Sequence, residues 1–545
     1  MKSLAILLLT STFLFSQSPY TNIQISNVSS PEEPSIQINP KNTNQVVAGA
    51  NISSYYYSSD AGSTWTRGTL TNSSWGVWGD PCIIVDTNQN FYFFHLSNTP
   101  GQWIDRIVCQ KSTNAGVSWN NPGSYTYVNW PRQQDKEWAI TDFTHGSRGN
   151  WIYCSWTQFD DYGTSNPADS SRILFARSTD AGITWTGVQR INKLSGNCVD
   201  GDYTVEGAVP AVGPNGEVYV AWAGPQSTNN FKIFFDKSTD GGNTWLANDI
   251  IAANNPGGWD LGSGSASGYG ILGIQRANGM PVTCCDLSNG PYNGYIYINY
   301  LDSVGTRDRD VMVVRSTNGG TTWSAPIRVN NDPPGAEQFF TWMTIDRATG
   351  VIYIVFYDRR NYYPPSTNTQ TDVYLAYSTN GGTTWINERI SSSPFTPTSG
   401  VFFGDYNCIT AHNGKVRPIW TRLSSGQLSV WTALINFPVG LKNINSEIPK
   451  SFGLHQNYPN PFNPVTKFRF DVAPLNPPNG GINNPFVVLK VYDILGKEIA
   501  TIVNNELSPG TYEYEWDASD LASGVYFYTI KANGFEATKK LVLSK

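Results

Sequence analysis

Aromatic and charged side chains gather in the long segments between the predicted strands of this chain. They are Trp75, Trp78, Trp103, Trp130 and Trp259, together with Asp80, Asp135, Lys136, Glu137, Arg359 and Arg360. Indole rings offer flat apolar faces, while carboxylates and guanidinium groups make directed polar contacts. This combination suits a sugar or an acidic polar ligand. A glycine-rich, solvated rim that traps aromatic rings is the alternative interpretation.

The composition of the chain argues against several classes of function. The chain has 545 residues, of which 39% are hydrophobic and 14% charged, and its net charge of −6 provides no basic surface for nucleic acid. With only four His residues we expect no His-rich metal centre, and the sequence indicates no cofactor. The acidic segment 160–169 is expected to be a solvated loop, and a calcium site with oxygen ligands is the alternative. The seven Cys residues cannot all pair, so we expect free buried thiols. The adjacent Cys284 and Cys285 could instead be redox-active or bind a metal.

Residues 1–16 have the pattern of a secretory signal peptide. Lys2 provides the positive start, and the apolar run from Leu4 to Phe15 is too short to span a bilayer. No later window holds about 18 consecutive apolar residues, so we expect no transmembrane helix. The sequence therefore predicts an exported protein.

One eight-residue motif recurs six times. It reads Ser-[Ser/Thr]-[Asp/Asn]-[Ala/Gly]-Gly-x-[Ser/Thr]-Trp, and its copies begin at Ser58, Ser112, Ser178, Ser238, Ser316 and Ser378. The Asp or Asn side chain can accept hydrogen bonds from a tight turn, the Gly allows a positive φ, and the Trp can pack between neighbouring units. We expect a structural role, because one carboxylate or amide per turn is too few for calcium.

Pairs of strand-like segments precede these motifs. Seven pairs begin near Pro34, Asp80, Trp138, Glu206, Pro281, Phe340 and Gly404. The seventh pair has no motif after it, but residues 23–27 match the strands that follow the motifs and could complete the seventh unit. A ring closed in this way leaves no exposed sheet edge. The sequence predicts an all-β protein with a β-propeller over residues 17–436, for which seven blades are favoured and six are possible.

The end of the chain has a different pattern. After a predicted linker at 437–450, residues 451–545 show strand-like stretches at 465–472, 486–493, 511–516 and 524–531, which predict a small Ig-like β-sandwich. This part resembles the C-terminal sorting domain of the type IX secretion system. The matching segments are 457–464, 491–496, 521–527 and 539–543. The resemblance implies export across the outer membrane, with release or surface anchoring, and the type IX machinery as partner.

The repeated motifs resemble the Asp-box, or BNR, repeat of sialidases and related propellers. The resemblance implies a ligand site on the face opposite the boxes. Sialidases place a nucleophilic Tyr at the start of the last blade and its activating Glu at the start of the fourth, which makes Tyr406 and Glu206 the candidate catalytic residues. A phenol with a pKa of ~10 needs such a base. The candidate substrate-binding residues are Arg359, Arg360, Asp80, Asp405 and Trp103.

Two sialidase features are missing. The Arg-Ile-Pro motif is replaced by Glu33-Pro-Ser-Ile36, and the segment 51–57 has no general-acid Asp. We therefore expect a secreted or surface-anchored sialidase-like propeller that acts on or binds extracellular glycans. If it is an enzyme, we expect a glycoside hydrolase of altered specificity. The alternative is a non-catalytic glycan-binding or adhesive exoprotein.

Overall fold

All regular elements of the described residues are β-strands. The computed structural model describes residues 18–261, 270–302, 308–364, 367–437, 441–445, 448–475, 485–518 and 521–545. The predicted signal peptide at 1–16 lies outside these residues. The chain divides into two units, residues 1–435 and 436–545. Within the described ranges, no helix is long and apolar enough to cross a membrane.

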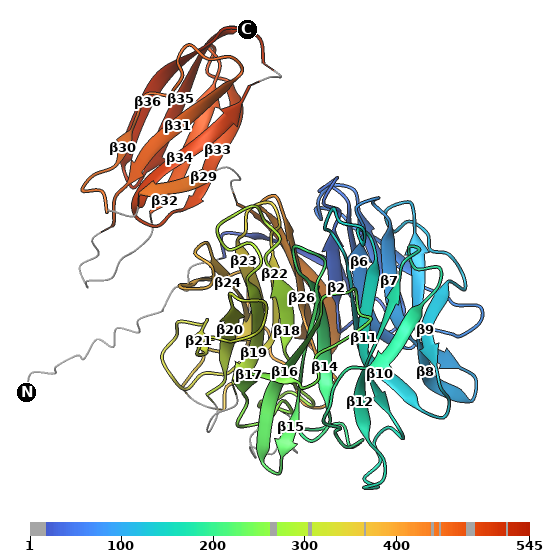
Figure 1. The fold of residues 1–545 in the computed structure, drawn as a ribbon. Helices are drawn as coiled ribbons and strands as arrows, with labels where there is room; N and C mark the ends of the chain where they lie inside the picture. The colour runs from blue at the N-terminus through green and yellow to red at the C-terminus, as the bar shows by residue number, and fades with distance from the viewer. Residues whose placement is uncertain are drawn as a thin grey trace, which may run out of the picture. The chain divides into compact units, whose positions relative to one another are not determined.

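Seven four-stranded antiparallel sheets form the N-terminal unit (Figure 1). The first three are β2–β5 (Ser35–Ile38, Val46–Ala50, Ser54–Ser58, Thr66–Thr69), β6–β9 (Gly79–Val85, Phe91–Thr99, Gln102–Ser112, Ser124–Val128) and β10–β13 (Gln133–Thr141, Ile152–Phe159, Ser171–Ser178, Thr186–Arg190). The next three are β14–β17 (Glu206–Val212, Val218–Ser227, Asn230–Ser238, Ile250–Asn254), β18–β21 (Val282–Cys285, Ile296–Asp302, Asp310–Ser316, Ile327–Arg328) and β22–β25 (Gln338–Ile345, Ile352–Asp358, Asp372–Ser378, Ile386–Arg389). The seventh contains β26 (Cys408–His412), β27 (Lys415–Ser424), β28 (Gln427–Asn436) and β1 (Thr21–Ser26).

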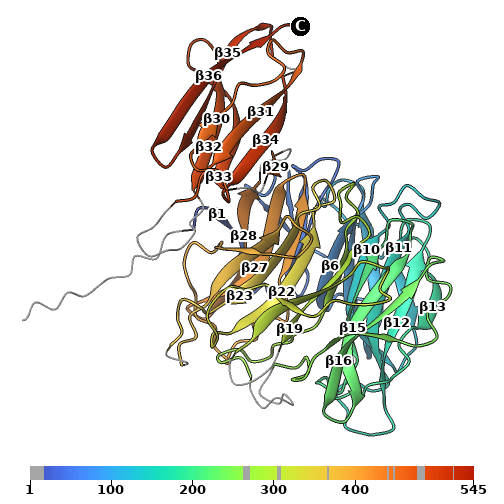
Figure 2. The same cartoon turned by 60° about the vertical axis from the view of Figure 1, so that its left-hand side comes forward.

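The first strands of the sheets contact one another in a closed cycle, which runs β2, β6, β10, β14, β18, β22, β26 and back to β2. Figure 2 shows the same sheets from a second direction. Seven sheets in this cyclic order are consistent with a seven-bladed propeller. The first strand of each sheet therefore lies innermost, and its start and end reach the two mouths of the ring.

The N-terminal strand β1 closes the ring. It pairs with β28 in antiparallel register, with Ile23 opposite Thr432, and so becomes the outer strand of the seventh sheet. The preceding sheet holds β1 as well, since Asn22 Nδ2 donates to the carbonyl of Ile390 at 2.8 Å and the Tyr20 hydroxyl donates to Glu388. The prediction that this segment completes the seventh unit is confirmed.

The six repeated boxes form the turns between the third and fourth strands. In the first box, Ser58 Oγ accepts a hydrogen bond from the amide of Gly62 at 2.9 Å, and Asp60 Oδ1 accepts one from Thr64 N at 2.8 Å. Several box indoles pack edge-to-face on a Phe of the preceding sheet. For example, the rings of Trp245 and Phe175 are 4.9 Å apart. The boxes thus fix tight turns and help join neighbouring sheets.

Asp240 provides a test of the box chemistry. Its carboxylate accepts hydrogen bonds from Thr244 N at 2.9 Å, Asn243 N at 3.0 Å and Thr244 Oγ1 at 2.7 Å. Although slight burial opposes ionisation, these contacts and that of Ser238 lower the pKa of Asp240 to about 2. Asp240→Ala should therefore lower the free energy of unfolding by about 1–2 kcal/mol, measured by urea denaturation.

The matched control is Asp240→Asn. Asn318 makes the same contacts in another box, accepting from Thr322 N at 3.0 Å and donating to Thr322 Oγ1 at 2.8 Å. The Asn variant should consequently cost less than about 0.5 kcal/mol. Equal losses from the two variants would show that the turn depends on the negative charge rather than on the hydrogen bonds.

The C-terminal unit contains two four-stranded sheets. One has the order β29 (Leu441–Asn445), β34 (Gly510–Asp517), β31 (Val465–Val472) and β30 (Gly453–Leu454). The other has the order β33 (Glu498–Glu506), β32 (Phe486–Tyr492), β35 (Gly524–Ala532) and β36 (Phe535–Leu543). Phe468, Leu489, Tyr528 and Ile530 belong to a common buried core. Strand β29 lies within the segment 437–450, for which the sequence predicted a linker. This part of the segment is a strand because its backbone pairs with β34.

Candidate functional site

Four inner strands share an irregularity near their starts. In β6, β10, β14 and β22, two residues oppose a single residue of the neighbouring strand. The first residue of each pair has a positive φ: Asp80 at 52°, Lys136 at 54°, Gly207 at 76° and Phe340 at 49°. Such β-bulges bend a strand and redirect its side chains, and they occur often beside active sites. They lie at the mouth opposite the boxes, because successive strands alternate in direction.

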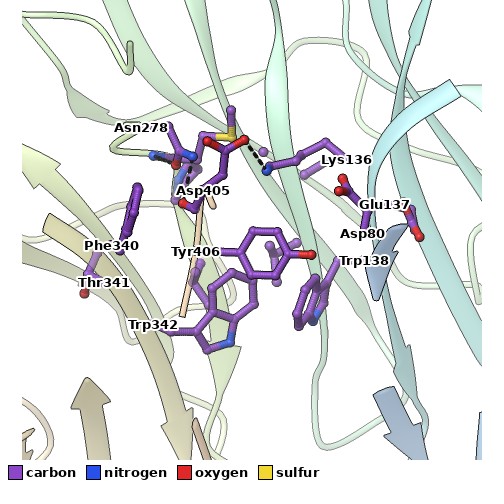
Figure 3. A pocket seen from close by; sticks show the side chains of 16 residues that line it. Asp80, Lys136, Glu137, Trp138, Asn278, Phe340, Thr341, Trp342, Asp405 and Tyr406 are labelled. Atoms are coloured by element: carbon purple, nitrogen blue, oxygen red, sulfur yellow. Dashed lines mark hydrogen bonds and ion pairs between the residues drawn. The ribbon is translucent and has the colours of Figure 1, made fainter. Parts of the chain in front are cut away.

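The bulges surround a cavity (Figure 3). Its lining comprises Asp80, Lys136, Glu137, Trp138, Gly207, Ala208, Val209, Asn278, Met280, Pro281, Val282, Phe340, Thr341, Trp342, Asp405 and Tyr406. Residues from the starts of six of the seven inner strands, or from just before them, therefore converge at this mouth. The seventh, β2, is preceded by the buried pair Glu32 and Glu33.

Aromatic rings form one side of the cavity. The rings of Trp138 and Trp342 are 4.2 Å apart, and each lies 5.9 Å from the ring of Tyr406. Lys136 Nζ lies 4.7 Å from the centre of the Tyr406 ring (Figure 3). These inclined rings form an apolar wall of the cavity, and charged groups lie beside them, as in many sites for small ligands.

Carboxyl groups surround the hydroxyl of Tyr406. Burial raises the pKa of Tyr406 well above its usual value, and the charges of Asp80, Glu33 and Glu137 raise it further. Burial, and next the charge of Asp80, likewise raise the pKa of Glu137 well above its usual value. The hydroxyl of Tyr406 and both carboxyl oxygens of Glu137 are buried and have no hydrogen-bond partner among the described residues. Glu137 is therefore a buried carboxyl group of the cavity lining whose burial favours the protonated form.

The pKa of Asp405 is shifted in the opposite direction from that of Glu137. Lys136 Nζ lies 3.2 Å from Asp405 Oδ2, and Arg276 Nε donates to Asp405 Oδ1 at 3.0 Å. Burial opposes ionisation of Asp405, but the charges of Arg276 and Lys136 outweigh it and hold the pKa far below its usual value. The site thus holds one carboxyl group as an acid and another as an anion, an arrangement typical of acid–base catalysis.

Glu206 belongs to a neighbouring acidic group. Burial, then the charges of Asp200 and Asp135, raise the pKa of Glu206 well above its usual value. Burial and the charge of Asp80 raise the pKa of Asp135 to about 8. Glu206 is not among the residues that line the cavity, and no hydrogen bond joins it to the Tyr406 hydroxyl in the described structure. The structure therefore does not bring the predicted catalytic pair into hydrogen-bond contact.

The predicted substrate-binding residues separate into three locations. Asp80 and Asp405 line the cavity. Arg359 is buried in an ion pair with Glu337, Arg360 Nη2 lies 2.7 Å from Asp358 Oδ2, and neither arginine lines the cavity. Trp103 lies outside it as well, between the rings of Trp78 and Tyr162. The two arginines are thus held by carboxylates of their own sheet.

Several residues of the site have roles that the sequence alone did not indicate. Lys136 and Glu137 carried the right chemistry, but nothing in the sequence placed them beside Tyr406, and Arg276 showed no signal for its contact with Asp405. Asn51 begins the segment 51–57, in which the sialidase resemblance implied a general-acid Asp and none occurs. Its amide donates to Glu33, and its Oδ1 accepts from the backbone N of Asp80 at 2.7 Å. Asn51 therefore positions the Asp80 bulge and cannot serve as an acid.

The cysteines are free thiols. All seven Cys residues are free, and all except the half-buried Cys284 are buried. Burial raises the pKa of Cys284 to about 12, so its thiol stays protonated. In the ranges that the structure covers, no group of three or more His, Cys, Asp or Glu side chains is arranged to hold a metal ion.

The C-terminal unit matches a known protein family. Residues 456–544 match the model of the "Secretion system C-terminal sorting domain". This unit is a secretion sorting domain. The resemblance inferred from its motifs is thereby confirmed, and the sorting domain directs the protein to the outer surface or the exterior of the cell and implies contact with the secretion machinery.

Other similar proteins include a xyloglucanase, an α-L-arabinofuranosidase, a sialidase and a Dyadobacter fermentans protein of unknown function. A xyloglucanase of a Paenibacillus species is 27% identical over 290 residues, which are 48% of this chain and 26% of that protein, so the match spans about a quarter of the relative. An α-L-arabinofuranosidase of Fusarium graminearum has a TM-score of 0.41 and 13% identity over 62% of this chain and 92% of its own. A Trypanosoma rangeli sialidase has a TM-score of 0.37 and 11% identity over 88% and 85%.

Proposed function

We propose that the N-terminal unit is an Asp-box propeller with seven blades and that it hydrolyses a neutral polysaccharide outside the cell. In this proposal a signal peptide at 1–16 is removed, the propeller spans 17–436, and the Ig-like sorting domain at 451–545 follows the segment 437–450. The observation that carries the hydrolase assignment is Glu137. Its carboxyl group is buried, has a raised pKa and has no hydrogen-bond partner in the described structure, and Glu137 lines the same cavity as Asp80.

Glycoside hydrolysis needs two carboxyl groups with different roles. One protonates the leaving oxygen, and the other either activates water or attacks the anomeric carbon. We assign the acid to Glu137, whose raised pKa keeps a proton available, and the second group to Asp80. The two carboxyl groups lie on the same side of the cavity, and the Tyr406 hydroxyl points toward them (Figure 3).

This assignment changes the role predicted for Tyr406. A tyrosine nucleophile requires a base in contact with its hydroxyl, and Glu206 makes no such hydrogen bond. Because the pKa of Tyr406 is raised, its hydroxyl stays protonated. We therefore assign Tyr406 as a hydrogen-bond donor to Asp80 or to the sugar.

The charges of the site support a neutral substrate. A sialic acid carboxylate needs free arginines, yet Arg276 pairs with Asp405 and Asp200, and Arg359 and Arg360 pair with carboxylates outside the cavity. The partial match to a xyloglucanase supports a neutral polysaccharide as the substrate class.

Turnover by the full-length secreted protein tests this proposal. We expect release of reducing ends from at least one member of a panel containing xyloglucan, arabinan, xylan and galactomannan, and no release of sialic acid from sialosides. Hydrolysis of sialosides alone would contradict the neutral-substrate assignment. A folded protein that hydrolyses none of these substrates would favour the non-catalytic glycan-binding alternative.

A further inference from the structure

Trp103 is held in place by two other aromatic rings. It lies at the start of β8, its ring centre is 6.1 Å from that of Trp78 and 5.6 Å from that of Tyr162, and both interplanar angles are 88°. Edge-to-face contacts on both sides fix the orientation of an indole. A ring fixed before the ligand arrives loses little conformational freedom on binding.

Two of these rings remain exposed. Trp78 retains 40% and Trp103 retains 38% of its accessible surface, whereas Tyr162 is half-buried. Single exposed apolar side chains are normal on protein surfaces, but a contiguous aromatic group marks an interaction site. We call Trp78, Trp103 and Tyr162 the aromatic platform.

The aromatic platform is connected to the cavity at both ends. The Tyr162 hydroxyl donates to Asp200 Oδ2 at 2.7 Å, and Arg276 bridges from Asp200 to Asp405 of the cavity lining. At the other end, Trp78 precedes Asp80 by two residues along the chain. All these elements lie at the mouth opposite the boxes, so a ligand that leaves the cavity can continue over the platform.

Sugar chemistry fits this surface. The C–H faces of a pyranose or furanose ring are apolar and pack on an indole, while the hydroxyl groups around the ring find hydrogen-bond partners in nearby carboxylates such as Asp200. The arginines on the same rim are paired with carboxylates, Arg132 and Arg172 with Asp160 and Arg276 with Asp200, so they are poorly placed to bind a polyanionic chain. The chemistry therefore favours an uncharged saccharide chain.

We propose that the aromatic platform binds sugar units adjacent to those in the cavity, so that the protein recognises several consecutive residues of a neutral polysaccharide. This inference rests on the proposed function, since it extends the site assigned there. It makes the polymer, rather than a single terminal sugar, the natural ligand.

The test compares polymer binding with turnover of small substrates. Affinity gel electrophoresis of the full-length protein would use hydroxyethyl cellulose, arabinan and galactomannan, with polygalacturonate as the anionic comparison. At least one neutral polymer should retard the protein, and Trp103→Ala should weaken that retardation at least about tenfold. Trp103→Phe should retain part of it, because a ring is still present.

Controls separate the platform from the hydrolase assignment. Ile183→Ala removes an apolar side chain that is 68% exposed in a box at the opposite mouth, and it should change nothing. Ile183→Ala should also leave turnover of any accepted aryl glycoside within about twofold of the wild type. Trp103-dependent binding without hydrolysis would support the platform and contradict only the hydrolase assignment. The platform would be overturned if no neutral polymer retarded the protein, or if Trp103→Ala bound like the wild type.

Discussion

Glu137→Gln is expected to lower kcat/KM on a neutral polysaccharide by about 10²–10⁴, the usual contribution of a general acid. The amide has nearly the same shape as the protonated carboxyl group but has no acidic proton to transfer. Because burial disfavours the charged form of Glu137, the uncharged amide should leave the thermal midpoint within a few degrees of the wild type. Initial rates and thermal unfolding of the same preparations provide the measurement.

Glu206→Gln is the matched control for this experiment. Glu206 is also buried, begins the corresponding inner strand β14 and has a raised pKa, yet it does not line the cavity. Its replacement should lower kcat/KM less than about tenfold. A Glu206→Gln variant as inactive as Glu137→Gln would support the Tyr406–Glu206 pair that the sequence predicted. A fully active Glu137→Gln variant would show that Glu137 is not the general acid.

The pH dependence follows from the same group. Since Glu137 must donate a proton, activity should fall as the pH rises through its raised pKa and persist below it. A limb of the pH profile that disappears in Glu137→Gln, in whatever residual activity remains, would identify that titration.

Removal of β1 should have the second large effect. A chain that begins at Asn27 lacks the strand that pairs with β28, so β28 becomes an exposed edge and loses several backbone hydrogen bonds. We expect the thermal midpoint of the N-terminal unit to fall by about 5–10 °C relative to a chain that begins at Gln17. Differential scanning calorimetry of the two proteins would measure it.

A peptide in trans keeps this prediction testable if the shortened protein aggregates. A synthetic peptide of residues 17–27 should restore the midpoint and solubility when present in excess, because it can occupy the edge of β28. An unchanged midpoint after truncation would show that the ring closes without β1.

The fold could be predicted to a large extent because its signals are local. Each box combines a turn acceptor, a glycine at a positive φ and an indole within eight residues, as in the segment from Ser58 to Trp65. The apolar strand pairs then set the number of units. Even the closing strand was predictable, since residues 23–27 repeat the pattern of the other outer strands.

The site could be predicted only in part because it depends on register and on distant partners. The bulge in β10 brings the consecutive residues Lys136, Glu137 and Trp138 to the cavity, and no sequence pattern marks that shift in register. Arg359 and Arg360 had suitable chemistry, but their carboxylate partners occupy them. Asp80 and Asp405 line the cavity because they lie at the starts of predicted inner strands, and their role in substrate binding stays a prediction.

The most direct test of the central claim is the release of reducing ends from the panel of neutral polysaccharides by wild-type protein and Glu137→Gln, assayed side by side at equal folded concentration. Our account predicts turnover of at least one polymer by the wild type and a loss of about 10²–10⁴ in the variant. Equal turnover by the two proteins, or no turnover of any neutral polymer by the wild type, would contradict it.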